Sequence, residues 1–216
     1  MPNQNAVDVL PFPVQDELEG GSRRADFPEV NWLRMSAAVL LAIPVVPLLS
    51  FLCVAVKASS RGAAIYRQVR LGRGGRPFTM LKLRSMRHDA EAGTGAVWAT
   101  VGDCRTTRLG RFLRWSHLDE LPQLVNILRG EMAFVGPRPE RPEFVEKLAA
   151  EIPHYRDRLA VLPGVTGLAQ VNLPPDDSTE SVRKKLVFDR YYIEHRSLGM
   201  DLRVLAATAL RLLSIR

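Results

Sequence analysis

One long apolar segment dominates the hydrophobic pattern of the chain. Residues 35–56 form a run of 22 residues without a charge, and a straight helix of this length reaches about 33 Å, enough to cross a bilayer. Pro44 and Pro47 lie close to the middle of the run. Because each proline removes an amide donor and clashes with the preceding turn, the pattern predicts a break or a sharp kink there.

The charges around this segment indicate how it meets a membrane. Basic residues flank both of its ends, namely Arg23, Arg24 and Arg34 before it and Lys57, Arg61, Arg67 and Arg70 after it. Lys and Arg favour the cytoplasmic side, so both ends are expected to face the cytosol. We therefore predict a re-entrant helix-break-helix over residues 32–60, which enters and leaves one leaflet. A single kinked span is the alternative, and a core helix of a soluble protein fits less well because such helices seldom run this long without a charge.

The rest of the pattern predicts a mainly helical α+β fold, with a small cytosolic domain over residues 61–216 and a polar tail or linker over residues 1–31. Two strands, at residues 64–69 and 77–83, are expected to form a hairpin around a glycine turn. A polar loop is expected over residues 87–103. The predicted helices cover residues 119–129, 139–152, 181–196 and 200–215, and a helical period also begins near residue 107.

The last of these helices is too short to span a membrane. It either packs on the core or lies at the level of the lipid headgroups, and packing is the simpler expectation. Its apolar surface could also serve a homodimer. The two cysteines, Cys53 and Cys104, are expected to be small buried hydrophobic residues, since two thiols build neither a disulfide framework nor a four-ligand zinc site.

Composition and charge narrow the choice of partners. The chain of 216 residues is 46% apolar, which is enough for one buried core, and its formal net charge is +7. The basic excess is concentrated between residues 61 and 115, which hold twelve basic and three acidic residues. Such a block attracts nucleic acid, anionic lipid or a diphosphate, although a solvated basic face explains it equally well. Nucleic acid is disfavoured because aromatic residues make up only 7% and no RNA-binding aromatic motif accompanies the basic residues.

Candidate chemistry is concentrated in LDELPQ at residues 118–123. The common phosphate-binding glycine loops, the HExxH zinc motif and the GxSxG elbow are absent from the sequence. Asp119 and Glu120 stand at a helix start marked by Pro122, where the helix dipole favours ionised carboxylates. One interpretation is a capping Asp followed by a first-turn acid. The other is a carboxylate nucleophile beside a metal-binding carboxylate, which needs Mg²⁺ and nearby basic residues to attack phosphorus.

Two proline- and glycine-rich stretches follow this motif. GPRP at residues 136–139 holds Arg138 between two prolines, so its guanidinium is presented on a stiff backbone for a bidentate oxyanion contact. A rigid turn with an exposed Arg is the plainer interpretation. PGVTG at residues 163–167 is typical of a tight turn.

Together, four blocks resemble the bacterial sugar transferase family, the monotopic phosphoglycosyl transferases, in order and spacing. They are KLRSM at residues 82–86, LRWSHLDELPQLVNILRGEMAFVGPRPE at 113–140, PGVTGLAQV at 163–171 and FDRYYIEHRSLGMDLRVLAAT at 188–208. The resemblance runs over residues 47–208, about three quarters of the chain, and is to the minimal catalytic form of the family. One departure is Val46, which replaces the serine that precedes the proline at the family's helix break, and Pro44 is an added proline.

The resemblance implies transfer of a sugar-1-phosphate from a UDP-sugar to a polyprenyl phosphate, usually undecaprenyl phosphate, with release of UMP. This reaction would begin a lipid-linked surface glycan pathway at the cytosolic face of the bacterial inner membrane. The family's acidic dyad falls on Asp119, the implied nucleophile, and Glu120, the implied Mg²⁺ ligand. The resemblance also implies that Lys82, Arg114 and Arg138 contact phosphate. Arg84 of the basic block and Asp189 complete the expected substrate-binding set. Asp189 and Asp201 match acidic positions of the family whose roles are not assigned, and neither the sugar nor the glycan is predicted.

A function of another class stays open at this stage. A non-catalytic protein that binds membrane surfaces, or a scaffold, would use the basic block only for lipids. Such a protein would have no special need for Asp119 or Glu120.

Overall fold

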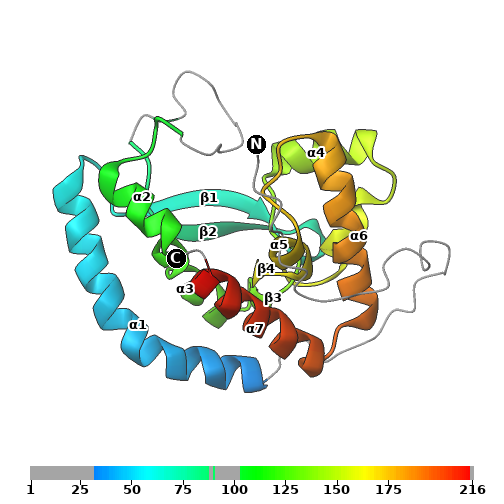
Figure 1. The fold of residues 1–216 in the computed structure, drawn as a ribbon, viewed down its shortest axis with the longest axis horizontal. Helices are drawn as coiled ribbons and strands as arrows, with labels where there is room; N and C mark the ends of the chain where they lie inside the picture. Colours follow the sequence, from blue (N-terminus) through cyan, green and yellow to red (C-terminus); the bar gives the residue numbers. More distant parts are fainter. Residues whose placement is uncertain (1–31, 88–89, 91–102, 215–216) are drawn as a thin grey trace.

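Helices make up most of the described structure, and the strands are few and short (Figure 1). The computed structural model describes residues 32–87, 90 and 103–214. The tail predicted at residues 1–31 and nearly all of the loop predicted at residues 87–103 lie outside the described residues. The predicted class, mainly helical α+β, is confirmed.

The α-helices are α1 (Trp32–Ser59), α2 (Arg108–Trp115), α3 (Gln123–Leu128), α4 (Pro142–Glu151), α5 (Leu168–Asn172), α6 (Thr179–His195) and α7 (Leu198–Ser214). The short 3₁₀ helices are η1 (Arg73–Gly75), η2 (Leu118–Glu120) and η3 (Tyr155–Ala160). The strands are β1 (Ile65–Leu71), β2 (Pro77–Leu83), β3 (Ala133–Val135) and β4 (Gly164–Thr166).

The apolar segment forms α1, which continues through both Pro44 and Pro47. The helix bends along its length (Figure 1) but is not interrupted. Each proline removes one hydrogen bond from the helix, and neighbouring residues maintain the helical path around the lost bonds. The structure therefore shows a bent, continuous helix instead of the predicted helix-break-helix.

One narrow face of α1 packs on the rest of the fold. Ala38, Val45 and Leu52 are buried and follow one another at intervals of seven residues, which is about two helical turns. They join apolar clusters built with β2, α2 and α3. Within the described part of the chain, α1 is the one helix long and apolar enough to cross a membrane, and only 17% of its most apolar window is buried.

Arginine side chains fasten both ends of α1. At its start, Arg34 forms an ion pair with Asp201 of α7 at 3.3 Å. Near its end, Arg84, which follows β2, donates to the main-chain carbonyl of Val56, in the last turn of the helix, at 3.3 Å. It also donates to the carbonyls of Ser60, at 2.7 Å, and of Ala63, just after the helix. Carbonyls at a helix C-terminus lack partners within the helix, so Arg84 acts as a cap that ties α1 to the end of β2.

We expect Arg84→Ala to lower the free energy of unfolding by about 2 kcal/mol or more, because one buried and two part-buried carbonyls lose their charged donor. Thermal and denaturant unfolding of the detergent-solubilised protein would measure this change. Arg61→Ala, at an exposed arginine next to the same loop, is the control. Equal unfolding midpoints for the two variants would contradict the capping role.

The hairpin is present as predicted. β1 and β2 pair antiparallel, from Ile65 opposite Leu83 to Leu71 opposite Pro77. The turn between them places Gly74 at φ 65° and Gly75 at φ 75°, a region that favours glycine. Lys82 is thereby carried near the end of a strand whose register is fixed.

The prediction of a simple turn at residues 163–167 is wrong. Gly164–Thr166 forms β4, which pairs in parallel with β3, so that Val135 lies opposite Thr166. The two backbones approach so closely that a Cβ on Gly164 would lie 2.1 Å from the nitrogen of Gly136. The glycines of the stretch therefore serve close packing of two chain segments that are distant in sequence.

The helix predicted over residues 119–129 is divided in two. Residues 118–120 form η2, and α3 begins only after Pro122. His117 precedes η2 with φ 55° in the left-handed region, which turns the chain sharply after α2. The dyad therefore lies in a separate 3₁₀ turn and not in the first turn of the α-helix.

Helix α7 packs on the core, as predicted, through Met200, Val204 and Ala207. Its other side is exposed at Leu202 and Leu210. The expectation of two buried cysteines is wrong for Cys104, which is exposed, whereas Cys53 is half-buried.

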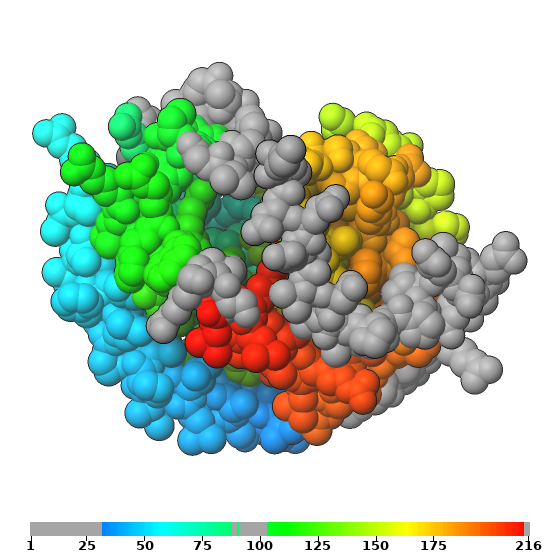
Figure 2. Space-filling view, in the orientation of Figure 1, coloured from blue at the N-terminus to red at the C-terminus, as the bar shows by residue number. Residues whose placement is uncertain are grey.

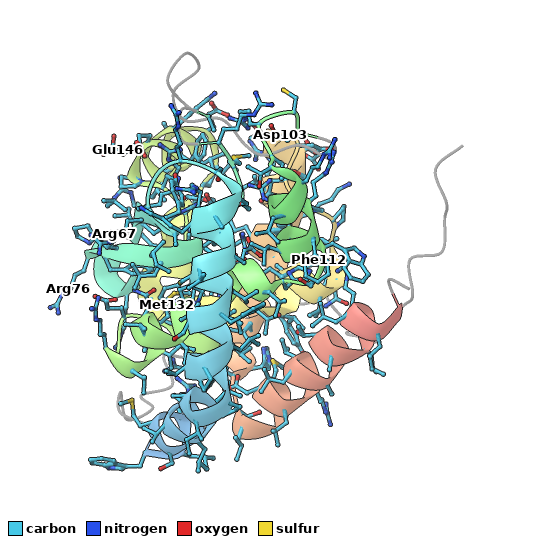
Figure 3. All side chains as sticks on the ribbon, turned by 90° about the vertical axis from the view of Figure 1, so that its left-hand side faces the viewer. Arg67, Arg76, Asp103, Phe112, Met132 and Glu146 are labelled. Carbon is cyan, nitrogen blue, oxygen red and sulfur yellow. The ribbon has the colours of Figure 1, made fainter. Side chains whose placement is uncertain are left out.

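Exposed large apolar side chains concentrate on three helices, and we call this set the apolar surface. Apart from Tyr66 and Val69, those in the described residues all belong to α1, α2 and α7. Phe112 projects outward from α2 (Figure 3), and α2 and α7 share one face of the molecule in the space-filling view (Figure 2). Exposed patches of this kind mark membrane or protein contacts.

Candidate active site

The dyad lies between a strand and a loop that both supply basic side chains. Asp119 in η2 is only 7% exposed. The Oε1 atom of the neighbouring Glu120 lies 2.7 Å from Nζ of Lys82, near the end of β2, and 3.7 Å from Nη1 of Arg138, in the loop after β3. Segments from three parts of the sequence thus place two carboxylates beside two cations.

The buried side chain of Asn126 fixes the segment after the dyad against the strand that carries Lys82. Asn126 in α3 is fully buried, and its side chain accepts from the nitrogen of Leu81 at 3.1 Å and donates to the carbonyl of Thr79 at 2.8 Å. Both partners belong to β2, next to Lys82. Sequence reasoning missed Asn126, because a lone polar residue within a helical period has no signal that distinguishes it.

The two carboxylates of the dyad have opposite electrostatic environments. Burial alone would raise the pKa of Glu120, but the positive charges of Lys82 and Arg138 outweigh it and lower that pKa to about 2. Burial raises the pKa of Asp119, and the charge of Lys82 only partly opposes this change. Glu120 is thus a fixed anion, and Asp119 is a more basic carboxylate in a poorly solvated position.

We expect Glu120→Gln to destabilise the protein at pH 7 by about 3 kcal/mol, since a pKa lowered from 4.5 to about 2 stabilises the fold. A lowered carboxyl pKa contributes stability above the ordinary value, and this contribution is lost as the pH falls toward about 2. Thermal unfolding at pH 7 tests the prediction, with the exposed Glu146→Gln on α4 (Figure 3) as the control. A melting temperature of Glu120→Gln equal to that of the control would refute it.

A buried arginine supports the loop that carries Arg138. Arg158 of η3 donates from Nη2 to the carbonyl of Arg138 at 3.1 Å and forms an ion pair with Asp189 of α6 at 2.8 Å. Its other terminal nitrogen donates to the hydroxyl of Tyr155 at 2.7 Å. Burial would lower the pKa of Arg158, but the charge of Asp189 raises it, so the guanidinium stays charged. Sequence reasoning also missed Arg158, which belongs to none of the motifs.

The structure brings together only some of the predicted site residues. Lys82 and Arg138 contact the dyad, and Arg114 lines the same cavity while its Nε donates to Ser85 at 2.8 Å. Arg84 also lines the cavity, but its guanidinium caps α1. Asp189 does not line the cavity and is buried against Arg158.

The cavity itself is large, with a volume of about 1360 Å³. Small-molecule sites span roughly 300–1,000 Å³, so there is room for more than one ligand. Its basic lining near the dyad suits phosphate groups, because Lys and Arg offset their charge. Buried carboxylates among such cations can bind a divalent metal or attack a phosphorus whose charge is neutralised.

The family is established by comparison with known proteins. A family model described as bacterial sugar transferase matches residues 31–214. The chain therefore belongs to the bacterial sugar transferase family, as its motifs predicted.

Individual relatives share a reaction type in their names. The chain is 40% identical over 215 residues to the UDP-glucose:undecaprenyl-phosphate glucose-1-phosphate transferase of Xanthomonas campestris pv. campestris. This match covers 98% of this chain and 44% of the relative. The chain is 44% identical over 184 residues to the protein of the same name from Caulobacter vibrioides, covering 84% and 68%. A UDP-N-acetylgalactosamine-undecaprenyl-phosphate N-acetylgalactosaminephosphotransferase of Aeromonas hydrophila is 40% identical over 172 residues, covering 79% and 40%. The chain thus spans less than half the length of the first and third of these relatives.

Proposed function

We propose that this protein transfers a sugar-1-phosphate from a UDP-sugar to undecaprenyl phosphate and releases UMP. The observation that carries the proposal is the buried Asp119–Glu120 pair beside Lys82 and Arg138, in a cavity next to an exposed apolar helix. The names of the relatives support both substrates. They name glucose and N-acetylgalactosamine, so the sugar of this chain has to be measured.

The reaction proceeds in two displacements at phosphorus. In the first, a carboxylate oxygen of Asp119 attacks the sugar-bearing phosphorus of the donor, and the bond from that phosphorus to the UMP oxygen breaks. UMP leaves with the electron pair, and the sugar phosphate remains on Asp119 as an acyl phosphate. In the second, an oxygen of the acceptor phosphate attacks the same phosphorus and the carboxylate leaves. Lys82 and Arg138 offset the charge of both phosphate-bearing substrates in turn.

A Mg²⁺ ion fits the donor set of the dyad. Both cations approach Oε1 of Glu120, which leaves Oε2 as the oxygen available to a metal. The described residues hold no cluster of three or more metal-ligating side chains, but Mg²⁺ commonly takes one or two carboxylates together with substrate phosphates and water. When bound, the ion would neutralise the diphosphate and stabilise the leaving UMP. Glu120 would hold it beside Asp119.

The apolar surface supports a position at the membrane. The exposed side chains of α1, α2 and α7 suit the acyl and headgroup region of a bilayer, where a lipid-linked phosphate is also found. We propose that α1 enters one leaflet in a re-entrant manner, at the cytosolic face of the inner membrane. Its bend and the basic residues Arg34 and Lys57 near its two ends favour this arrangement.

The decisive experiment measures UMP release by protein held in nanodiscs with Mg²⁺, undecaprenyl phosphate and a panel of UDP-sugars. We expect continuous release with one donor, dependent on the acceptor. A well-folded sample that releases no UMP with any donor would contradict the proposal and favour the non-catalytic membrane-binding scaffold. The placement of a buried dyad against two cations favours the enzyme.

A further inference from the structure

One ion pair in the wall of the large cavity has no part in the chemistry described so far. Nζ of Lys185, in α6, lies 3.0 Å from Oδ1 of Asp176, in the loop between α5 and α6. Both residues line the cavity, and their side chains are only 12% and 19% exposed. Because burial of an ion pair costs solvation that its Coulomb attraction barely repays, stability alone is a weak reason for this pair.

The loop that carries Asp176 is stiff on both sides of this residue. Pro174 and Pro175 precede it, and their fixed φ values restrict the backbone. After it, Ser178 and Ser181 form a capping box at the start of α6, and the hydroxyl of Ser181 also donates to Oδ1 of Asp176 at 3.4 Å. The carboxylate is therefore presented to the cavity at a low cost in conformational entropy.

The ion pair lies next to the loop of Arg138 in the active site. Lys185 precedes Asp189 by one turn of α6, and Asp189 pairs with Arg158. Arg158 in turn donates to the carbonyl of Arg138. Burial lowers the pKa of Arg138, but the surrounding carboxylates, Asp176 among them, raise it above its ordinary value. A group attached to a phosphate at Arg138 would thus lie close to the Lys185–Asp176 pair.

The pair has hydrogen-bonding capacity that the described part of the chain does not use. Lys185 and Ser181 both contact Oδ1 of Asp176, so Oδ2 has no partner among the described residues. The ammonium group of Lys185 carries three hydrogen atoms and has one partner there. An acceptor and a donor therefore lie side by side in the cavity wall, with no net charge.

We propose that Asp176 and Lys185 bind hydroxyl groups of the sugar that is transferred. Hydroxyls can donate to the carboxylate and accept from the ammonium group, whereas the carboxylate would repel a phosphate. The sugar is bonded to the phosphorus that Asp119 attacks, so its ring lies beside the phosphate bound by Arg138. The inference rests on the proposed function and names the residues that select the sugar.

Donor analogues test this assignment through specificity. With the wild-type protein, we expect a UDP-sugar that lacks a hydroxyl contacted by the pair to lose at least about tenfold in kcat/KM, because the carboxylate is left unpaired. In Asp176→Asn combined with Lys185→Met, which buries no charge, the complete donor should lose as much, and the missing hydroxyl should cost little more. If this double variant does not fold, Asp176→Asn alone gives the same readout.

A matched control and equal treatment of all analogues complete this test. Asp177→Asn combined with Lys184→Met changes the exposed neighbours, which do not line the cavity, and should discriminate like the wild type. A wild-type protein that uses every deoxy analogue as well as the complete donor would overturn the proposal. So would a cavity variant whose discrimination equals that of the control.

Equilibrium binding separates the sugar from the nucleotide. The same substitutions are placed in Asp119→Asn, and binding of the complete donor and of UDP is measured by calorimetry in nanodiscs. We expect the cavity variant to bind the donor at least about tenfold more weakly and UDP equally well. An equal loss for both ligands would assign the pair to the nucleotide and overturn the proposal. Wild-type protein that releases no UMP with any donor would overturn the proposed function instead, so the two failures are distinguishable.

Discussion

Replacing Asp119 by Asn is expected to abolish both the UMP burst and steady-state transfer, with a loss of at least about 10³-fold. The amide keeps the size of the side chain but removes the anionic oxygen that attacks phosphorus. Because burial raises the pKa of Asp119, ionising this group costs stability at neutral pH, so its replacement by a neutral amide is expected to keep or raise the melting temperature. The measurement is rapid-quench UMP release together with thermal unfolding.

Two controls sharpen this test. Asp157→Asn, at a half-exposed position, should change neither the burst nor the unfolding midpoint. Intact-mass spectrometry of wild-type protein treated with donor alone should show the added sugar phosphate, and Asp119→Asn should not. A variant that retains a full burst would exclude Asp119 as the nucleophile.

The second large effect is expected at the buried Arg158–Asp189 pair. Removing one partner leaves an unpaired charge inside the protein, which typically costs about 3–5 kcal/mol. We therefore expect Arg158→Met and Asp189→Leu each to unfold at much lower denaturant concentration than the wild type. The double variant should recover much of the loss, because it buries no charge. Denaturant unfolding of all four proteins completes the thermodynamic cycle.

A conservative replacement separates stability from positioning. Arg158→Lys retains a positive charge for Asp189 but cannot also reach the carbonyl of Arg138 with the same planar fork. We expect it to fold and to show reduced transfer through the displaced Arg138. In the cycle of Arg158→Met and Asp189→Leu, a double variant whose loss of unfolding free energy equals the sum of the two single losses would contradict the pairing of the two charges.

Local sequence patterns predicted the parts of the fold that are set locally. Two short strands around a glycine turn predicted the hairpin of β1 and β2, and an uncharged run predicted the extent of α1. The sequence did not reveal β4, because its glycines are typical of a turn when the neighbouring β3 backbone is unknown. It also did not show that His117 adopts a left-handed conformation and separates η2 from the following helix.

The same distinction between local patterns and contacts of distant segments explains which site residues the sequence predicted correctly. Motif resemblance pointed to Asp119, Glu120, Lys82 and Arg138, and the structure brings these four together. It also pointed to Asp189, whose charge is buried against Arg158 on η3. A motif marks which residues matter, but it does not distinguish a side chain that faces a substrate from one that supports a loop. That distinction depends on contacts between segments far apart in sequence, such as the one from Asn126 to β2.

Helix α1 has two different environments, the protein core on one face and an apolar exterior on the other. Its inward stripe of Ala38, Val45 and Leu52 must match the shapes of α3 and β2, whereas its outward residues need only be apolar. A fragment that begins after residue 60 would therefore lack one wall of the cavity. It would also expose Leu83 and Leu113, which pack beneath α1. During evolution, the inward-facing positions of α1, which recur at every second turn, should tolerate few substitutions. The outward-facing positions should exchange freely among apolar residues.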